Sequence, residues 1–202
     1  MDALTAGTVV PDPGAPEPIG PGRGALSHTG LDRFNALPPE AAAAELATCC
    51  ASRRWVAALS LARPFASVNA LYAAAAEQLA GLDWPDVSEA LDAHPRIGER
   101  ADGAGREAAW SRAEQSGAQD ADARTAADLA AANAAYEARF GHVFLIRAAG
   151  RSGAEMLAAA LDRVEHDELT EQAVVRDELG QIVRLRLDKL LAGLAEGTGS
   201  ST

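Results

Sequence analysis

Residues 175–190 read VRDELGQIVRLRLDKL, and the spacing of the apolar residues in this stretch indicates the fold class. At about 100° per residue, four apolar residues fall in one narrow sector of a helix: Val175, Leu179, Ile182 and Leu190. Arg186 falls in the middle of the same sector, whereas Arg184 points to the opposite side. The stretch therefore predicts a long final helix near 170–195 that buries one face.

The composition of the whole chain also favours helices. Of 202 residues, 48 are Ala and 22 are Leu, against 14 Ile and Val together. Ala and Leu lose little side-chain freedom in a helix, whereas β-branched residues lose more. We therefore expect an all-α fold and exclude an all-β one.

Apolar residues recur at intervals of three and four along the chain, and Pro and Gly separate the segments. The segments expected to be helical are 31–36, 39–50, 52–62, 67–81, 86–93, 105–118, 122–140, 152–165 and 170–195. The first of them is short enough to be a single turn, and Pro38-Pro39 suits entry into the second. No internal repeat is visible, so we predict a single compact bundle of about eight or nine helices rather than a solenoid.

Both ends of the chain differ in composition from the body. Residues 1–28 hold five of the ten prolines and five of the 18 glycines, so they bury too little apolar surface to offset chain entropy. We expect a disordered tail over 1–28 and a flexible, linker-like tail over 196–202. The helical domain is expected over 31–195, a length that suffices for a core without disulfides.

Charge and composition exclude several partner classes. The formal charge of −11 repels a phosphate backbone and no basic cluster offsets it, so no nucleic acid partner is expected. No apolar run approaches the roughly 18 to 20 residues of a membrane span, and the start lacks a signal-peptide pattern, so we expect a cytoplasmic protein and no membrane partner. Cys49 and Cys50 are adjacent, which suits core packing rather than a disulfide framework or a zinc motif.

The sequence HPRIG at 94–98 places a histidine directly before a proline at the end of an expected helix. The proline keeps His94 out of the α region, so its imidazole can project into a cleft. An imidazole titrates near neutrality, as acid–base catalysis requires. The alternative is a helix terminator with an exposed histidine.

Ser111, Glu114 and Gln115 lie at i, i+3 and i+4 and so share one face of an expected helix. Three polar groups on one face suit a small ligand that forms hydrogen bonds. The Ser-x-x-Glu pattern is also a capping box at a helix start, and spacing alone leaves both interpretations open. Arg186 presents a similar choice, because a guanidinium inside an apolar stripe needs an anion, either a structural carboxylate or a ligand.

Other motifs give little support for further chemistry. No Gly-rich phosphate loop, dinucleotide fingerprint, HExxH or Ser-hydrolase elbow is present. His166-Asp167 is similar to a motif of metal-dependent helical phosphohydrolases, but it lies in a charge run typical of a solvated turn, and we expect no metal site. A helix is expected to end at Gly141, and the aromatic residues around it are most simply core.

Four motifs, taken in order, resemble the family of 2-oxo-4-hydroxy-4-carboxy-5-ureidoimidazoline (OHCU) decarboxylases of urate breakdown. They are HPRIG at 94–98, SxxEQxG at 111–117, YxxRFGxxF at 136–144 and IxxLRLxxL at 182–190. The resemblance covers roughly residues 31–195. It implies an all-α carboxy-lyase without a cofactor, commonly a homodimer, that converts OHCU to (S)-allantoin.

The same resemblance assigns roles to individual residues. The catalytic residues that it implies are His94, Glu114 and Arg186. The substrate-binding residues that it implies are Pro95, Ser111, Arg112, Ala113, Gln115, Ile146, Arg147, Ala148, Ala149 and Gly150. This chain departs from the family pattern at Arg147, which either alters the pocket wall or points outward, and at His142, a candidate second imidazole near the site.

The implied reaction needs no cofactor, because a ring C=N bond of OHCU accepts the electron pair that the departing carboxylate leaves. We expect His94 to move the proton, and Arg186 to hold a carbonyl or carboxylate oxygen. Ser111 and Gln115 would bind the urea-like edges, and Glu114 would orient the imidazole or bind ureido N–H groups. The competing interpretation is a non-catalytic helical module that binds a ureide or a partner protein in the same cleft.

Overall fold

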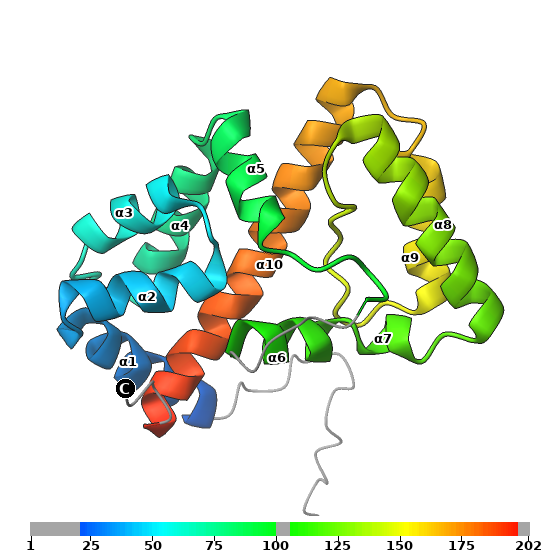
Figure 1. Cartoon of the computed structure of the whole chain (residues 1–202). Helices are drawn as coiled ribbons and strands as arrows, with labels where there is room; N and C mark the ends of the chain where they lie inside the picture. The colour runs from blue at the N-terminus through cyan, green and yellow to red at the C-terminus, as the bar shows by residue number, and fades with distance from the viewer. Residues whose placement is uncertain (1–20, 100–105, 198–202) are drawn as a thin grey trace, which may run out of the picture.

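The computed structural model describes residues 21–99 and 106–197, which form ten α-helices and no strand (Figure 1). The helices are α1 (Pro21–Ala36), α2 (Pro39–Cys49), α3 (Arg53–Leu61), α4 (Val68–Ala80), α5 (Trp84–Asp92), α6 (Arg106–Glu114), α7 (Ser116–Gln119), α8 (Ala123–Phe140), α9 (Gly153–Arg163) and α10 (Glu168–Glu196). Within these two ranges, no helix is both long enough and apolar enough to cross a bilayer. The predicted all-α fold class is confirmed.

Two helix boundaries differ from the expectation. α1 begins at Pro21 rather than near residue 31, so residues 21–28 of the expected tail are helical, and residues 1–20 lie outside the described residues. The expected boundary was wrong because the average composition of a segment does not show at which residue the first helix begins. The expected helix 105–118 is interrupted at Gln115, which separates α6 from α7. At the other end α10 extends to Glu196, and of the expected tail 196–202 the last five residues lie outside the described ones.

Side-chain caps explain where most helices start. Six helices follow a Ser or Asp whose side chain accepts a backbone N–H of the first turn: Ser52, Ser67, Asp83, Asp122, Ser152 and Asp167. A cap of this kind contributes about 1 kcal/mol to helix stability. α8 ends at Gly141, as predicted.

The long helix α10 is the central element of the fold. Figure 1 shows it running diagonally, with α1–α5 on one side and α6–α9 on the other. α1, α2 and α4 all pack against it. α1 comes closest at Gly30, where a Cβ would lie only 2.0 Å from the carbonyl oxygen of Leu191. The four residues of the predicted apolar stripe are all buried, which confirms the face assigned from the sequence.

The buried apolar side chains form two clusters. One joins α1–α5 to α10 and contains Cys49 and Cys50. Burial raises the pKa of the Cys49 thiol to about 12 and that of the Cys50 thiol to about 11, so their predicted role in core packing is confirmed. The other cluster joins α8 and α9 to the segment after Gly141. The predicted motifs converge where the two clusters meet.

Candidate active site

A cavity that is partly open to solvent lies at the junction of the two clusters. Its walls come from the turn after α5, the end of α6, the segment 144–149 and α10. We call residues 144–149 the wall segment. The lining residues are His94, Pro95, Ile97, Ser111, Glu114, Gln115, Phe144, Leu145, Ile146, Arg147, Ala148, Ala149, Ile182, Leu185 and Arg186.

His94 supplies a neutral, hydrogen-bond-accepting nitrogen to this cavity. The residue follows the end of α5 and is 9% exposed, so it is not the exposed helix terminator that the sequence also allowed. Its Nδ1 lies 2.8 Å from the carbonyl oxygen of Ala90, which can only accept, so Nδ1 carries the proton. Nε2 is buried without a hydrogen-bond partner in the described part of the chain and holds the free lone pair.

Two effects lower the pKa of His94 from its ordinary value of 6.5 to about 4. The larger is burial, which disfavours the charged imidazolium, and the second is the positive charge of Arg186. The imidazole is therefore neutral at pH 7, with its basic nitrogen already unprotonated.

Arg186 lies across the cavity and is 6% exposed. Its Nη2 donates to Ser111 Oγ at 3.0 Å and to Glu114 Oε2 at 3.3 Å. Its Nε is buried and has no partner among the described residues. The interpretation as a structural ion pair therefore holds, because Glu114 supplies the carboxylate, while a ligand for the remaining N–H stays a prediction.

Glu114 is held between two cations. Its Oε2 accepts from Arg186, and its Oε1 accepts from Lys189 Nζ at 2.8 Å. The Lys189 ammonium also lies 5.7 Å from the centre of the Trp110 ring, a cation–π contact. Sequence reasoning missed Lys189, although it lies one turn beyond Arg186 on the same helix. No hydrogen bond joins Glu114 to His94 in the described part of the chain, and the carboxylate acts on the imidazole only through its charge, which works to raise the His94 pKa.

The shared face of Ser111, Glu114 and Gln115 is confirmed. Ser111 lies within α6, five residues after its first residue, so it does not cap a helix start. All three side chains are buried and line the cavity. Gln115 Oε1 accepts the backbone N–H of Gly98 at 3.1 Å, which ties the end of α6 to the HPRIG turn that carries His94.

The predicted binding residues divide into two groups. Pro95 and the wall residues Ile146, Arg147, Ala148 and Ala149 line the cavity. Arg112, Ala113 and Gly150 do not. Ala113 projects from the solvent-facing side of α6, and Gly150 is exposed in the turn that follows the wall segment.

His142 does not lie in the cavity wall. Its ring packs edge-on against Trp84 and Tyr136, with centroid distances of 5.2 Å and 5.5 Å, in an aromatic group that also includes Phe140. The candidate second imidazole therefore lies outside the cavity wall.

Gly117, the last residue of the SxxEQxG motif, allows close contact between α7 and the chain after the wall segment. A Cβ on Gly117 would lie 2.0 Å from the carbonyl oxygen of Arg151. Any larger residue would force these two backbones apart. Close packing of α7 against the chain just after the wall segment therefore requires a glycine at this position of the motif.

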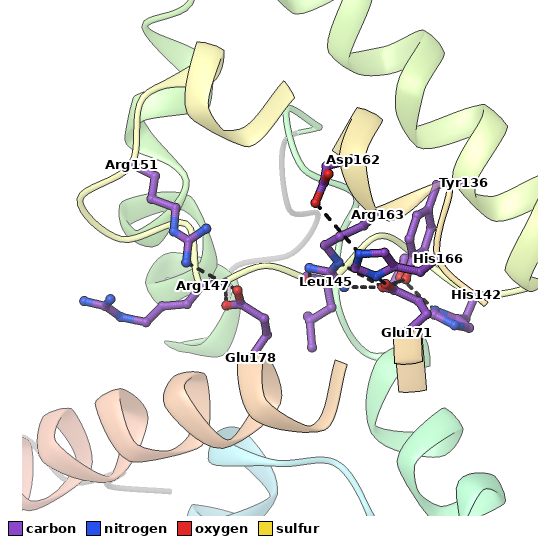
Figure 2. A network of polar contacts seen from close by, with 11 residues as sticks. Tyr136, His142, Leu145, Arg147, Arg151, Asp162, Arg163, His166, Glu171 and Glu178 are labelled. Atoms are coloured by element: carbon purple, nitrogen blue, oxygen red, sulfur yellow. Dashed lines mark hydrogen bonds and ion pairs between the residues drawn. The ribbon is translucent and has the colours of Figure 1, made fainter. Parts of the chain in front are cut away.

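The charge run lies in the exposed turn between α9 and α10, as predicted, but the partly buried His166 also joins a polar network. Its Nδ1 lies 2.9 Å from Glu171 Oε2, and Glu171 also accepts from Tyr136 and Arg163 (Figure 2). No three His, Cys, Asp or Glu side chains of residues 21–99 and 106–197 are grouped as they would be around a metal ion. Asp167 caps α10 instead.

The model of the OHCU decarboxylase family matches residues 35–188 of this chain. The chain belongs to the OHCU decarboxylase family. The resemblance inferred from the four motifs is therefore confirmed.

Two proteins with similar sequences come from a plant and an archaeon. The uric acid degradation bifunctional protein TTL of Arabidopsis thaliana is 33% identical over 159 residues, which are 75% of this chain and 48% of the plant protein. The 2-oxo-4-hydroxy-4-carboxy-5-ureidoimidazoline decarboxylase of Haloferax volcanii is 32% identical over 136 residues, 66% of this chain and 79% of that protein. The chain thus spans about half the length of the plant relative.

Two solved structures share the fold. A crystal structure of OHCU decarboxylase in the presence of (S)-allantoin superposes with a TM-score of 0.63 at 32% identity, covering 73% of this chain and 97% of the other. A crystal structure of (S)-allantoin synthase gives a TM-score of 0.60 at 18% identity, covering 79% of this chain and 53% of the other, and supports the fold alone.

Proposed function

We propose that this protein converts OHCU to (S)-allantoin with loss of carbon dioxide and without a cofactor. One observation carries the proposal. The lone pair of His94 Nε2 and the N–H of Arg186 Nε are both buried without partners among the described residues, and both residues line one cavity. Buried polar atoms without partners are costly, so a base and a cationic donor left open in one cavity favour a polar, anionic ligand.

The chemistry of the substrate accounts for what these two groups do. The carbon that loses carbon dioxide bears a hydroxyl and adjoins a ring C=N bond. When the C–C bond to the carboxylate breaks, its electron pair enters the ring, the C=N nitrogen takes a proton, and an enol-like intermediate forms. The hydroxyl then gives up its proton as its oxygen becomes a carbonyl, and the neighbouring carbon gains a proton on one face, which sets the (S) configuration.

His94 is the proposed acceptor of the hydroxyl proton, since its Nε2 is unprotonated before the substrate arrives. Arg186 Nε would donate to the carboxylate or to the developing carbonyl oxygen. Glu114 fixes the direction of the guanidinium through its bond to Nη2, and Lys189 fixes Glu114 in turn.

The remaining residues of the proposed binding set act on the rest of the substrate. Ser111 and the amide nitrogen of Gln115 would bind urea-like edges, because the amide oxygen of Gln115 is already occupied by Gly98. Pro95 and the wall segment would enclose the ring, with the peptide groups of Ile146 facing the ureido N–H and C=O groups. For Arg112, Ala113 and Gly150, a role in binding stays a prediction.

A homodimer and a cytoplasmic location are further parts of the proposal. The groove between α4 and α10, lined by exposed small residues such as Ala76 and Ala80 and by charged ones such as Arg184, is the surface proposed for a second copy. Light scattering that gives the mass of a single chain across the working concentration range would contradict the dimer. Recovery in the membrane or secreted fraction would contradict the location.

The decisive experiment follows the handedness of the product by circular dichroism while fresh OHCU decays. The wild type should give (S)-allantoin faster than the uncatalysed reaction, and His94→Asn should give racemic product at the uncatalysed rate. His142→Asn is a matched control, because it changes the same residue type outside the cavity and should retain turnover. Racemic product from the wild type would end the enzyme proposal, and tight allantoin binding without turnover would favour the non-catalytic module.

A further inference from the structure

The wall segment contains no helix or strand, so its backbone lacks the ladder of hydrogen bonds that orients peptide groups elsewhere. Instead, two side chains form hydrogen bonds that orient the peptide groups on either side of Ile146 (Figure 2). Arg163 Nη1 donates to the carbonyl oxygen of Leu145 at 2.8 Å, and Glu178 Oε2 accepts the backbone N–H of Arg147 at 2.7 Å. The side chain of Arg147 itself runs away from Glu178.

These two bonds determine both peptide planes of Ile146. A trans peptide is planar, with its C=O and N–H pointing in opposite directions, and neither bond here is cis. Fixing the carbonyl of Leu145 therefore fixes the N–H of Ile146, and fixing the N–H of Arg147 fixes the carbonyl of Ile146. Ile146 is 2% exposed and lines the cavity, so the direction of its polar groups matters to whatever the cavity holds.

Each anchor has a second ion-pair partner: Arg163, at the end of α9, binds Glu171 of α10, and Glu178 of α10 binds Arg151. Arg163 Nε donates to Glu171 Oε1 at 2.9 Å, and Arg151 Nη2 donates to Glu178 Oε1 at 3.3 Å. Glu171 and Glu178 are seven residues apart, two helical turns, and so project from the same face of α10 toward the wall segment. The side chains are 0% and 9% exposed.

We propose that Glu178 is a positioning residue that holds the peptide groups of Ile146 in the orientation that binds the substrate. It touches no reacting atom and acts only through the backbone of the wall segment. This inference rests on the proposed function, because it takes the wall segment to be part of the substrate pocket. Glu178 is the better anchor to test, since Arg163 is bound to Glu171, which Tyr136 and His166 also contact, and its loss would disturb that whole network.

The experiment measures KM for OHCU and the Kd of (S)-allantoin for Glu178→Ala, Glu178→Gln and Arg151→Met. Glu178→Ala should raise both constants about tenfold, the loss expected for one hydrogen bond to a charged group, while kcat changes much less. Glu178→Gln keeps an oxygen that accepts the N–H of Arg147 and should restore most of the affinity. Arg151→Met removes only the partner of Oε1 and should raise KM by a smaller factor.

These measurements separate positioning from folding. KM does not depend on the concentration of active enzyme, so a variant that merely unfolds in part loses maximal rate with an unchanged KM. Asp177→Ala is the matched control, because it removes an exposed carboxylate from the neighbouring position of α10 and should leave KM unchanged.

The outcomes distinguish this inference from the proposed function. With an active wild type, an unchanged KM and Kd in Glu178→Ala overturn the positioning role. If Glu178→Ala does not fold, Arg151→Met carries the test, and KM and Kd at their wild-type values in that variant overturn the positioning role. Absence of turnover and of allantoin binding in the wild type would instead refute the proposed function.

Discussion

Replacing His94 should change how stability depends on pH, and the size of the change follows from its environment. The pKa is about 4 in the folded protein against an ordinary value of 6.5. Between these values the unfolded chain binds more protons than the folded one, so lowering the pH favours unfolding. From pH 7 to pH 5 the imidazole should cost the wild type about 2 kcal/mol of stability, and His94→Asn should lack this loss.

Urea unfolding followed by far-ultraviolet circular dichroism at pH 7, 6 and 5 measures this difference. The replacement itself changes the absolute stability, so the comparison is between slopes against pH rather than between values at one pH. The carboxyl groups titrate in both proteins, so the difference between the two slopes isolates His94. If the stability of His94→Asn falls in parallel with that of the wild type, the imidazole is not buried in a neutral form.

Three further variants test the guanidinium of the site and the packing around it. Arg186→Lys keeps the charge but has no fork with which to bind Glu114 and a ligand together, so kcat/KM should fall roughly thirtyfold, about 2 kcal/mol; wild-type kinetics would refute the role of the guanidinium. Gly117→Ala should destabilise the fold by roughly 1–3 kcal/mol, as overpacking does, and raise KM. Gly180→Ala, in ordinary contact at 3.5 Å within α10, should instead stabilise it by about 0.5–1 kcal/mol; equal melting temperatures for the two variants would contradict the close approach.

Local pattern was sufficient to predict most of the helices. Ala and Leu, together with Pro and Gly between the segments, placed the helical body, and the predicted and observed ends of α8 and α10 agree closely. The break at Gln115 was not predictable, because α6 and α7 separate where Gly117 meets the backbone of Arg151. That contact joins residues that no local window includes.

The residues of the candidate site were predicted only where the signal is local in the sequence. A proline after His94 and the helical spacing of Ser111, Glu114 and Gln115 are local signals, and they identified side chains that line the cavity. Lys189 carries no such signal, since a lysine on a helix is ordinary until its partner is known. That partner, Glu114, is 75 residues away.

The sequence by itself determined the all-α class, the buried face of the last helix and the arginine within it, because helical periodicity reports which face leaves water. Only the tertiary structure decided what that arginine meets, which nitrogen of His94 is basic, and how the peptide groups beside Ile146 are held. Each of these depends on an atom from a distant segment, and hydrogen bonds and desolvation are set by where atoms lie in space.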